Sequence, residues 1–152
     1  MTKRFKKVRF YLKYMIIKEK NSKELRKLIN SSKGKVIVEA GNEKLNNFLV
    51  ANNKIDVIFN FEKFTNRDYF NMRQSGLNHV MCNALKKNGI AVGFDFGAVL
   101  NKEGFERSKL LGKMEQNVRF CKKYKVKMVF DNFGGSVDQV LLDAFSRVLS
   151  EN

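Results

Sequence analysis

The chain has 152 residues, and its 30 Lys and Arg against 15 Asp and Glu give it a net charge of +15. Hydrophobic residues make up 43% of it, enough for one folded domain over 1–152, and no apolar run approaches the roughly 18 residues of a membrane helix. The length is short for a complete eight-unit βα barrel, which needs at least roughly 200 residues. No secretory signal pattern is visible, so we expect a cytoplasmic protein with no membrane partner.

Short apolar segments alternate with longer segments of helical periodicity. The run KVIVE at 35–39 is typical of a buried parallel strand, and Asn88-Gly89 ends a helix that carries Val80 and Met81 at helical spacing. The predicted strands are 7–17, 35–39, 55–59, 90–96 and 127–130; the predicted helices are 21–29, a segment after Asn42, 77–88, 105–124 and 136–149. This alternation predicts an α/β fold, a parallel sheet of βα repeats with right-handed crossovers.

The positive charge is unevenly distributed. Residues 1–35 hold 13 Lys and Arg against two Glu, so this segment carries +11 and the remainder carries +4. A domain this basic repels itself unless a polyanion neutralises it, which points to RNA, DNA or an anionic membrane. The sequence pattern of the basic segment is typical of a strand and not of an amphipathic helix, which argues against binding to a membrane surface.

Polar residues follow the predicted strands, where parallel βα folds gather their ligands. They are Glu39, Asn60, Glu62, Asp95, Asp131 and Asn132. A small metal-dependent phosphoesterase or nuclease using Asp95, Asp131 and His79 is one alternative, but His79 is the only histidine, and such sites usually hold several. Carboxylates that cap helices or pair with Lys and Arg are the simpler interpretation, so we expect no metal ligands and no catalytic residues.

The two cysteines, Cys82 and Cys121, lie on predicted apolar helix faces and have no C-x-x-C spacing. We therefore expect buried structural thiols rather than metal ligands.

The segment between the third strand and the following helix contains candidate RNA contacts. Arg73, Ser75, Asn78 and His79 precede or begin that helix, where exposed backbone amides favour anions such as phosphate. A second basic run, which includes Lys125 and Lys127, brackets Tyr124. Basic and aromatic residues together are typical of proteins that follow an RNA backbone.

Several segments in order resemble the barrel-type protein subunit of ribonuclease P, called component 3 in archaea and p30 as a family. They are SKELRKLI, VEAGNEKLN, KIDVIF, RQSGLNHV, GIAVGFDF, FERSKLL and KYKVKMV. The resemblance implies an RNA-binding, non-catalytic subunit that supports removal of the 5′ leader from precursor tRNA, with catalysis by the RNA subunit and its Mg²⁺ and no cofactor bound by this chain. It adds Arg107 to the expected RNA contacts.

The resemblance also implies a trimmed TIM-like barrel. The family's barrel has two further βα units before the point where this chain starts, and additional helices after its last matching segment. We expect the exposed sheet edges to pair with another chain, such as the family's small α/β partner subunit. A purely structural assembly protein that binds partners without RNA remains an alternative, and the small size favours an archaeal source.

Overall fold

Strands and helices alternate along the chain in the computed structural model, which describes residues 14–63 and 74–151 except 134 and 137. The strands are β1 (Tyr14–Ile17), β2 (Lys35–Glu39), β3 (Val57–Phe59), β4 (Ala91–Asp95) and β5 (Met128–Asp131). The helices are α2 (Ser22–Ser31), α3 (Glu43–Val50), α4 (His79–Asn88), α5 (Phe96–Leu100), α6 (Gly104–Tyr124) and α7 (Gln139–Ser150). The predicted α/β fold is confirmed.

The strands form one parallel sheet in the order β1-β2-β3-β4-β5. The register runs from Ile16 beside Ile37, through Ile37 beside Val57, to Gly93 beside Val129. Because all the strands run in the same direction, their carboxyl ends share one edge of the sheet. We call this edge the rim.

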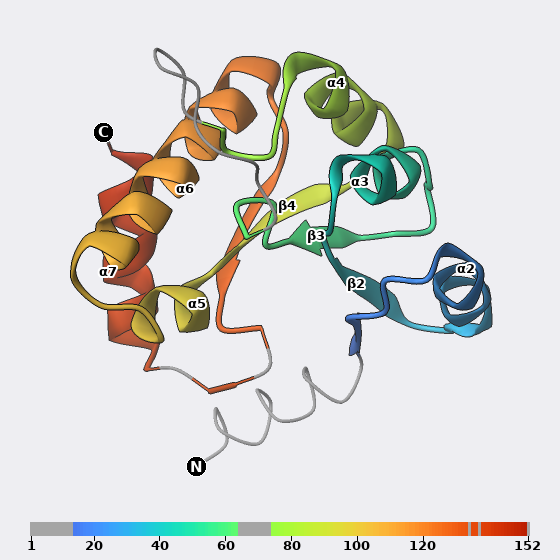
Figure 1. Cartoon of the computed structure of the whole chain (residues 1–152), viewed down its shortest axis with the longest axis horizontal. Helices are drawn as coiled ribbons and strands as arrows, with labels where there is room; N and C mark the ends of the chain where they lie inside the picture. Colours follow the sequence, from blue (N-terminus) through green and yellow to red (C-terminus); the bar gives the residue numbers. More distant parts are fainter. Residues whose placement is uncertain (1–13, 64–73, 134, 137, 152) are drawn as a thin grey trace.

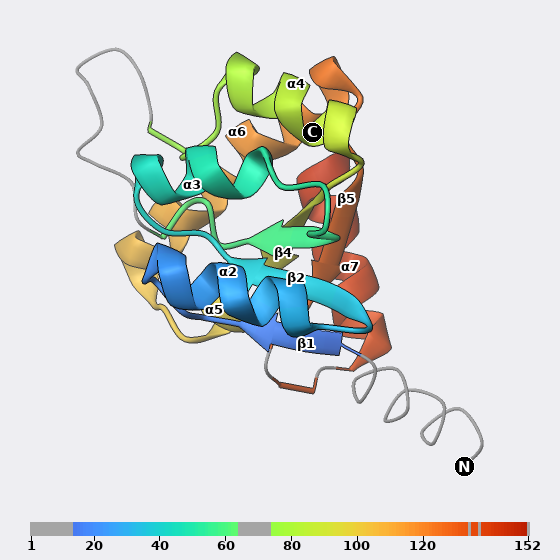
Figure 2. The same cartoon turned by 90° about the vertical axis from the view of Figure 1, so that its right-hand side faces the viewer.

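Alternation along the strands divides the apolar side chains between two faces. Val36 and Val38 join the larger core, which also contains buried residues of α2, α3, α4, α6 and α7. Ile37 points to the other face, into a smaller cluster with Phe59 and Phe133, whose rings stack at 4.5 Å. Helices packed against one face of sequentially ordered parallel strands make a segment of a TIM-like βα barrel, not a doubly wound sheet. Figures 1 and 2 show α2, α3 and α4 following one another in the order of their strands.

Local signals explain where most helices begin and end. Asn21, Asn42 and Asn78 precede α2, α3 and α4, and each side-chain oxygen accepts a hydrogen bond from a backbone amide of the first turn. Gly89 ends α4 with a φ of 67°, a conformation that glycine adopts without strain.

The structure corrects two details of the sequence prediction. The predicted strand 90–96 ends at Asp95, whose side chain caps the unpredicted helix α5. Val80, expected on the apolar face of α4, is 62% exposed, because the buried face is formed by Met81, Cys82 and Leu85. The predicted strand 7–17 is described only from Tyr14 onward, and most of the predicted loop 60–75 lies outside the described residues.

Both cysteines are free and buried, as predicted. Burial raises the pKa of Cys82 to about 11, and it raises the pKa of Cys121 further. Among the helices of the described segments, none is both long and apolar enough to cross a membrane.

Candidate functional site: a polar cavity at the rim

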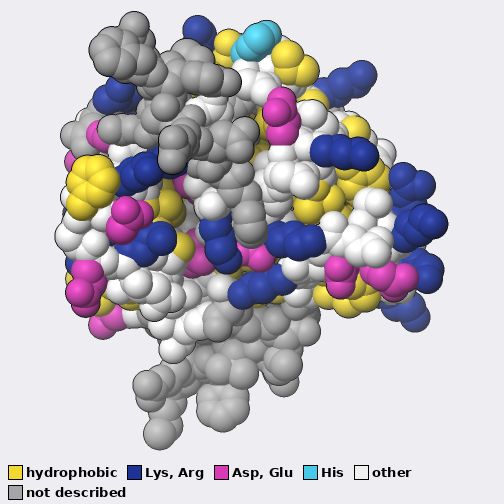
Figure 3. Space-filling model, viewed as in Figure 1, with side chains coloured by type: hydrophobic (Ala, Val, Ile, Leu, Met, Phe, Trp, Pro, Cys, Tyr) yellow, Lys and Arg dark blue, Asp and Glu magenta, His cyan; other side chains and the backbone are white. Residues whose placement is uncertain are grey.

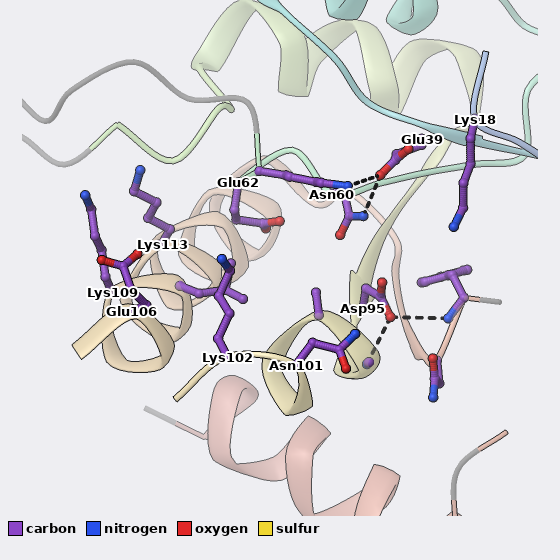
Figure 4. A pocket seen from close by; sticks show the side chains of 16 residues that line it. Lys18, Glu39, Asn60, Glu62, Asp95, Asn101, Lys102, Glu106, Lys109 and Lys113 are labelled. Carbon is purple, nitrogen blue, oxygen red and sulfur yellow. Dashed lines mark hydrogen bonds and ion pairs between the residues drawn. The ribbon is translucent and has the colours of Figure 1, made fainter. Parts of the chain in front are cut away.

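The polar residues that follow the strands come together at the rim. Glu39, Asn60, Glu62, Asp95 and Asn132 line one cavity of about 620 Å³, which confirms that these strand-end groups share an edge of the sheet (Figure 4). Asp131 ends β5 nearby but is not part of the lining. The first four of these residues, which end β2 and β4 or follow β3, are less than 8% exposed and form the floor of the cavity.

Glu39 is held by one amide and two lysines. Its Oε1 accepts hydrogen bonds from Asn60 Nδ2 at 3.0 Å and Lys63 Nζ at 3.1 Å, and Lys20 Nζ lies 3.3 Å from its Oε2. Burial alone would raise the pKa of Glu39, but the Asn60 and Lys63 hydrogen bonds and the charges of both lysines outweigh it and lower the pKa. Glu39 is therefore an ionised, neutralised part of the floor.

Glu62 lies in a different environment. It is fully enclosed, and burial raises its pKa to about 7, although a hydrogen bond from Asn117 and the charge of Lys113 oppose the shift. Asn117 Nδ2 donates to Glu62 Oε1 and to the backbone carbonyl of Ser75, both at 2.8 Å. The Asn117 Oδ1 and Ser75 Oγ atoms are buried without a hydrogen-bond partner among the described residues. This cluster joins α6 to the segment that precedes α4.

Asp95, also on the floor, holds two backbone segments in place. Its Oδ1 accepts hydrogen bonds from the amides of Gly97 at 3.0 Å and Phe133 at 3.3 Å, so one carboxylate fixes the start of α5 and the segment after β5. Burial raises its pKa despite these hydrogen bonds. Gly97 leaves room for the Asn132 side chain, because a Cβ at position 97 would overlap Asn132 Oδ1.

Lysines surround the mouth of the cavity. Lys18, Lys63, Lys102 and Lys109 are exposed, and Glu106 is the exposed acidic residue of the lining. In Figure 3 dark blue side chains frame a central hollow in which magenta carboxylates are visible. Lys18, Lys102 and Lys109 form no ion pair with another described residue, so their charge is available to a ligand. These three lysines are not among the RNA contacts predicted from the sequence.

The predicted RNA contacts near α4 occupy different environments. Arg73 lies outside the described residues. Ser75 is only 2% exposed, and Asn78 uses its side-chain oxygen to cap α4 through the Met81 amide at 2.9 Å. His79, the first residue of α4, is exposed. Of this group, His79 is thus the side chain that the described structure presents to solvent.

The three remaining predicted contacts do not lie together. Arg107 Nε donates to the carbonyls of Lys102 at 2.6 Å and Val99 at 3.1 Å, so its guanidinium binds the end of α5. Lys125 ends α6, and Lys127 precedes β5, so both exposed lysines lie at the amino edge of the sheet, opposite the rim. The six predicted contacts that the structure describes therefore do not form one surface.

The carboxylates of the rim do not form a metal centre. Within residues 14–63 and 74–151, leaving aside 134 and 137, no three His, Cys, Asp or Glu side chains are placed to hold a metal ion. The phosphoesterase alternative thus finds no ligand set in this part of the chain.

Comparison with known proteins gives the family. The family model described as RNase P subunit p30 matches residues 1–130. The chain belongs to the RNase P subunit p30 family. The resemblance stated from the sequence is confirmed.

Archaeal proteins are among the relatives of this p30-family chain. Ribonuclease P protein component 3 of Methanosarcina acetivorans is 32% identical over 114 residues, which cover 73% of this chain and 44% of the relative. The Methanococcus maripaludis protein of the same name is 29% identical over 119 residues, covering 76% and 48%. The chain thus matches a little under half the length of these relatives.

A solved structure has the same fold. A chain from a cryo-EM structure of archaeal ribonuclease P with mature tRNA superposes with a TM-score of 0.76 at 22% identity. The match covers 98% of this chain and 68% of the other. This similarity supports the barrel-segment architecture of the p30-family chain.

Proposed function

We propose that the chain is an RNA-binding protein subunit of ribonuclease P that supports removal of the 5′ leader from precursor tRNA. The RNA subunit, with its Mg²⁺, performs the cleavage, and this chain helps to bind and organise that RNA. The observation that carries the proposal is the match of the p30 family model to residues 1–130. The net charge of +15 supports it, because a polyanion relieves the repulsion between the cationic side chains.

The rim is the RNA-binding face that the described structure favours. Three of its exposed lysines, Lys18, Lys102 and Lys109, lack ion-pair partners in the described segments, whereas Lys63 is paired with Glu39 deeper in the cavity. Lysine side chains of this kind bind phosphates and release the counterions of the RNA. His79 remains a candidate contact from the sequence prediction, whereas Lys125 and Lys127, also predicted from the sequence, lie at the opposite edge and outside this face.

The proposed partners are ribonuclease P RNA, precursor tRNA in the holoenzyme, and the other protein subunits, in particular the small α/β subunit. The relatives that carry the name of a ribonuclease P component support these partners. A cytoplasmic location is part of the proposal, since the relatives are archaeal.

Reconstitution tests the proposed function. The RNA subunit and the other proteins are mixed with precursor tRNA, with and without this chain, and release of the 5′ leader is measured at limiting Mg²⁺. We expect the chain to raise the cleavage rate and to have no cleavage activity alone. Cleavage by the chain alone that chelator abolishes would favour the phosphoesterase alternative. Partner binding without RNA binding would favour the assembly protein.

A further inference from the structure

The rim cavity is layered by charge. Its floor is made mainly of buried acidic and amide side chains, including Glu62, Asp95 and Asn60, together with the buried Lys113, each less than 8% exposed. Its mouth is made mainly of exposed lysines, as described above. In Figure 4, Lys18 and Lys102 reach toward the cavity from opposite sides. A ligand that fits this layering is polar and uncharged at its inner end and anionic at its outer end.

A single phosphate does not fit this layering. The cavity of about 620 Å³ is within the roughly 300–1,000 Å³ of small-molecule sites, far more than one phosphate fills. Moreover, the Asp95 carboxylate lies on the floor without an ion-pair partner among the described residues, so an anion there meets its negative charge. A bare metal ion lacks a ligand set among the described residues.

An unpaired nucleotide matches both the floor and the mouth of the cavity. The amino and imino groups of a base are donors for carboxylate oxygens, and the carbonyl and ring-nitrogen atoms of a base accept from amides and lysines. Leu110 and Ala98 supply apolar wall that a base can contact. The Asn101 side chain also lines the cavity and forms no hydrogen bond within the described segments, so its amide is available. Proteins that recognise RNA sequence usually bind such unstacked bases.

We propose that the rim cavity receives one unpaired nucleotide of the RNA, with the base on the acidic and amide floor and its flanking phosphates on Lys18, Lys102 and Lys109. This inference rests on the proposed function and specifies what the rim binds. Under this proposal the chain recognises unpaired nucleotides in addition to helical RNA.

Asn101→Trp tests the proposal, because it fills the cavity mouth without removing a charge. Asn101 is exposed and has a right-handed backbone conformation (φ −79°, ψ −5°) that any residue adopts, so the variant is expected to fold. Ser108→Trp is the matched control, since Ser108 is exposed on α6 and is not part of the lining. Far-UV circular dichroism and a thermal melt check that both variants are folded.

Binding of the full chain is measured by fluorescence anisotropy with single-stranded RNA of about eight nucleotides and with an RNA duplex. We expect Asn101→Trp to weaken single-strand binding about tenfold, the equivalent of about 1.4 kcal/mol, and to leave duplex binding unchanged. Ser108→Trp should change neither. In NMR spectra of the wild type, the side-chain amide signals of Asn60 and Asn101 should shift with the single strand but not with the duplex.

Equal binding of both RNAs, unaffected by Asn101→Trp, would overturn the nucleotide site while leaving RNA binding and the proposed function intact. Loss of both RNAs in the folded Asn101→Trp variant would also overturn it, since the cavity would then not distinguish unpaired from paired RNA. If the wild type bound none of the single-stranded RNA, the duplex and ribonuclease P RNA, that result would instead count against the proposed function.

Discussion

Glu62 should make the stability of the chain fall as pH rises. Its pKa is raised from 4.5 to about 7 in the folded chain, mainly by burial, so the folded state holds a proton that the unfolded state releases. The stabilisation is fully present below pH 4.5 and is lost as pH rises to about 7. A shift from 4.5 to about 7 at 1.36 kcal/mol per unit corresponds to about 3 kcal/mol of unfolding free energy.

Glu62→Gln isolates this effect, because the neutral amide keeps an oxygen that can accept the Asn117 hydrogen bond. Urea unfolding of both proteins from pH 5 to pH 8 measures the difference. At pH 5 the two should have similar stability, and at pH 8 the variant should be more stable by about 3 kcal/mol, since only the wild type must ionise a buried group. Parallel curves for the two proteins across this range would refute the reasoning.

Three further predictions concern the buried structure. Asn46→Ala removes two hydrogen bonds to the backbone of Gly41 and should lower the unfolding free energy by about 2 to 4 kcal/mol in urea titrations; an unchanged midpoint would contradict this. Gly93→Ala places a Cβ 2.7 Å from the Phe133 ring and 2.8 Å from Phe59 Cβ, and should destabilise by about 1 to 3 kcal/mol in the same assay; equal stability of variant and wild type would count against it. Cys82 and Cys121, buried and with raised pKa values, should resist maleimide until the chain unfolds; rapid native labelling would show otherwise.

The sequence predicted those elements whose signals are local. The helix α4 combines a capping Asn78 with Gly89 at its end, and β2 is a continuous apolar run, so neither depends on distant contacts. The short helix α5 was missed because five residues are too few to show helical periodicity, and its apolar sequence continues that of β4. The capping position of Asp95 was the available signal.

The sequence also predicted part of the site, namely the part that depends on the strands alone. The strand-end groups could be placed at one edge, because parallel strands impose it. The lysines at the mouth come from segments far apart in the sequence, such as Lys18 after β1 and Lys109 on α6, and their meeting depends on the sheet order and on how the helices pack. Arg107 illustrates the converse: its charge suggested RNA, but it binds carbonyls at the end of a helix that the sequence did not reveal.

The central claim is that the lysines of the rim bind ribonuclease P RNA, and the salt dependence of that binding tests it most directly. The dissociation constant is measured against salt for the wild type, for Lys102→Ala/Lys109→Ala at the rim, and for Lys125→Asn/Lys127→Ala at the opposite edge. Each lost phosphate contact should reduce the slope of log K against log salt by about 0.7 to 0.9. We expect the rim variant to show weaker binding and a shallower slope, with little change in the other variant. An unchanged slope in the rim variant, or a loss confined to the opposite edge, would contradict the account.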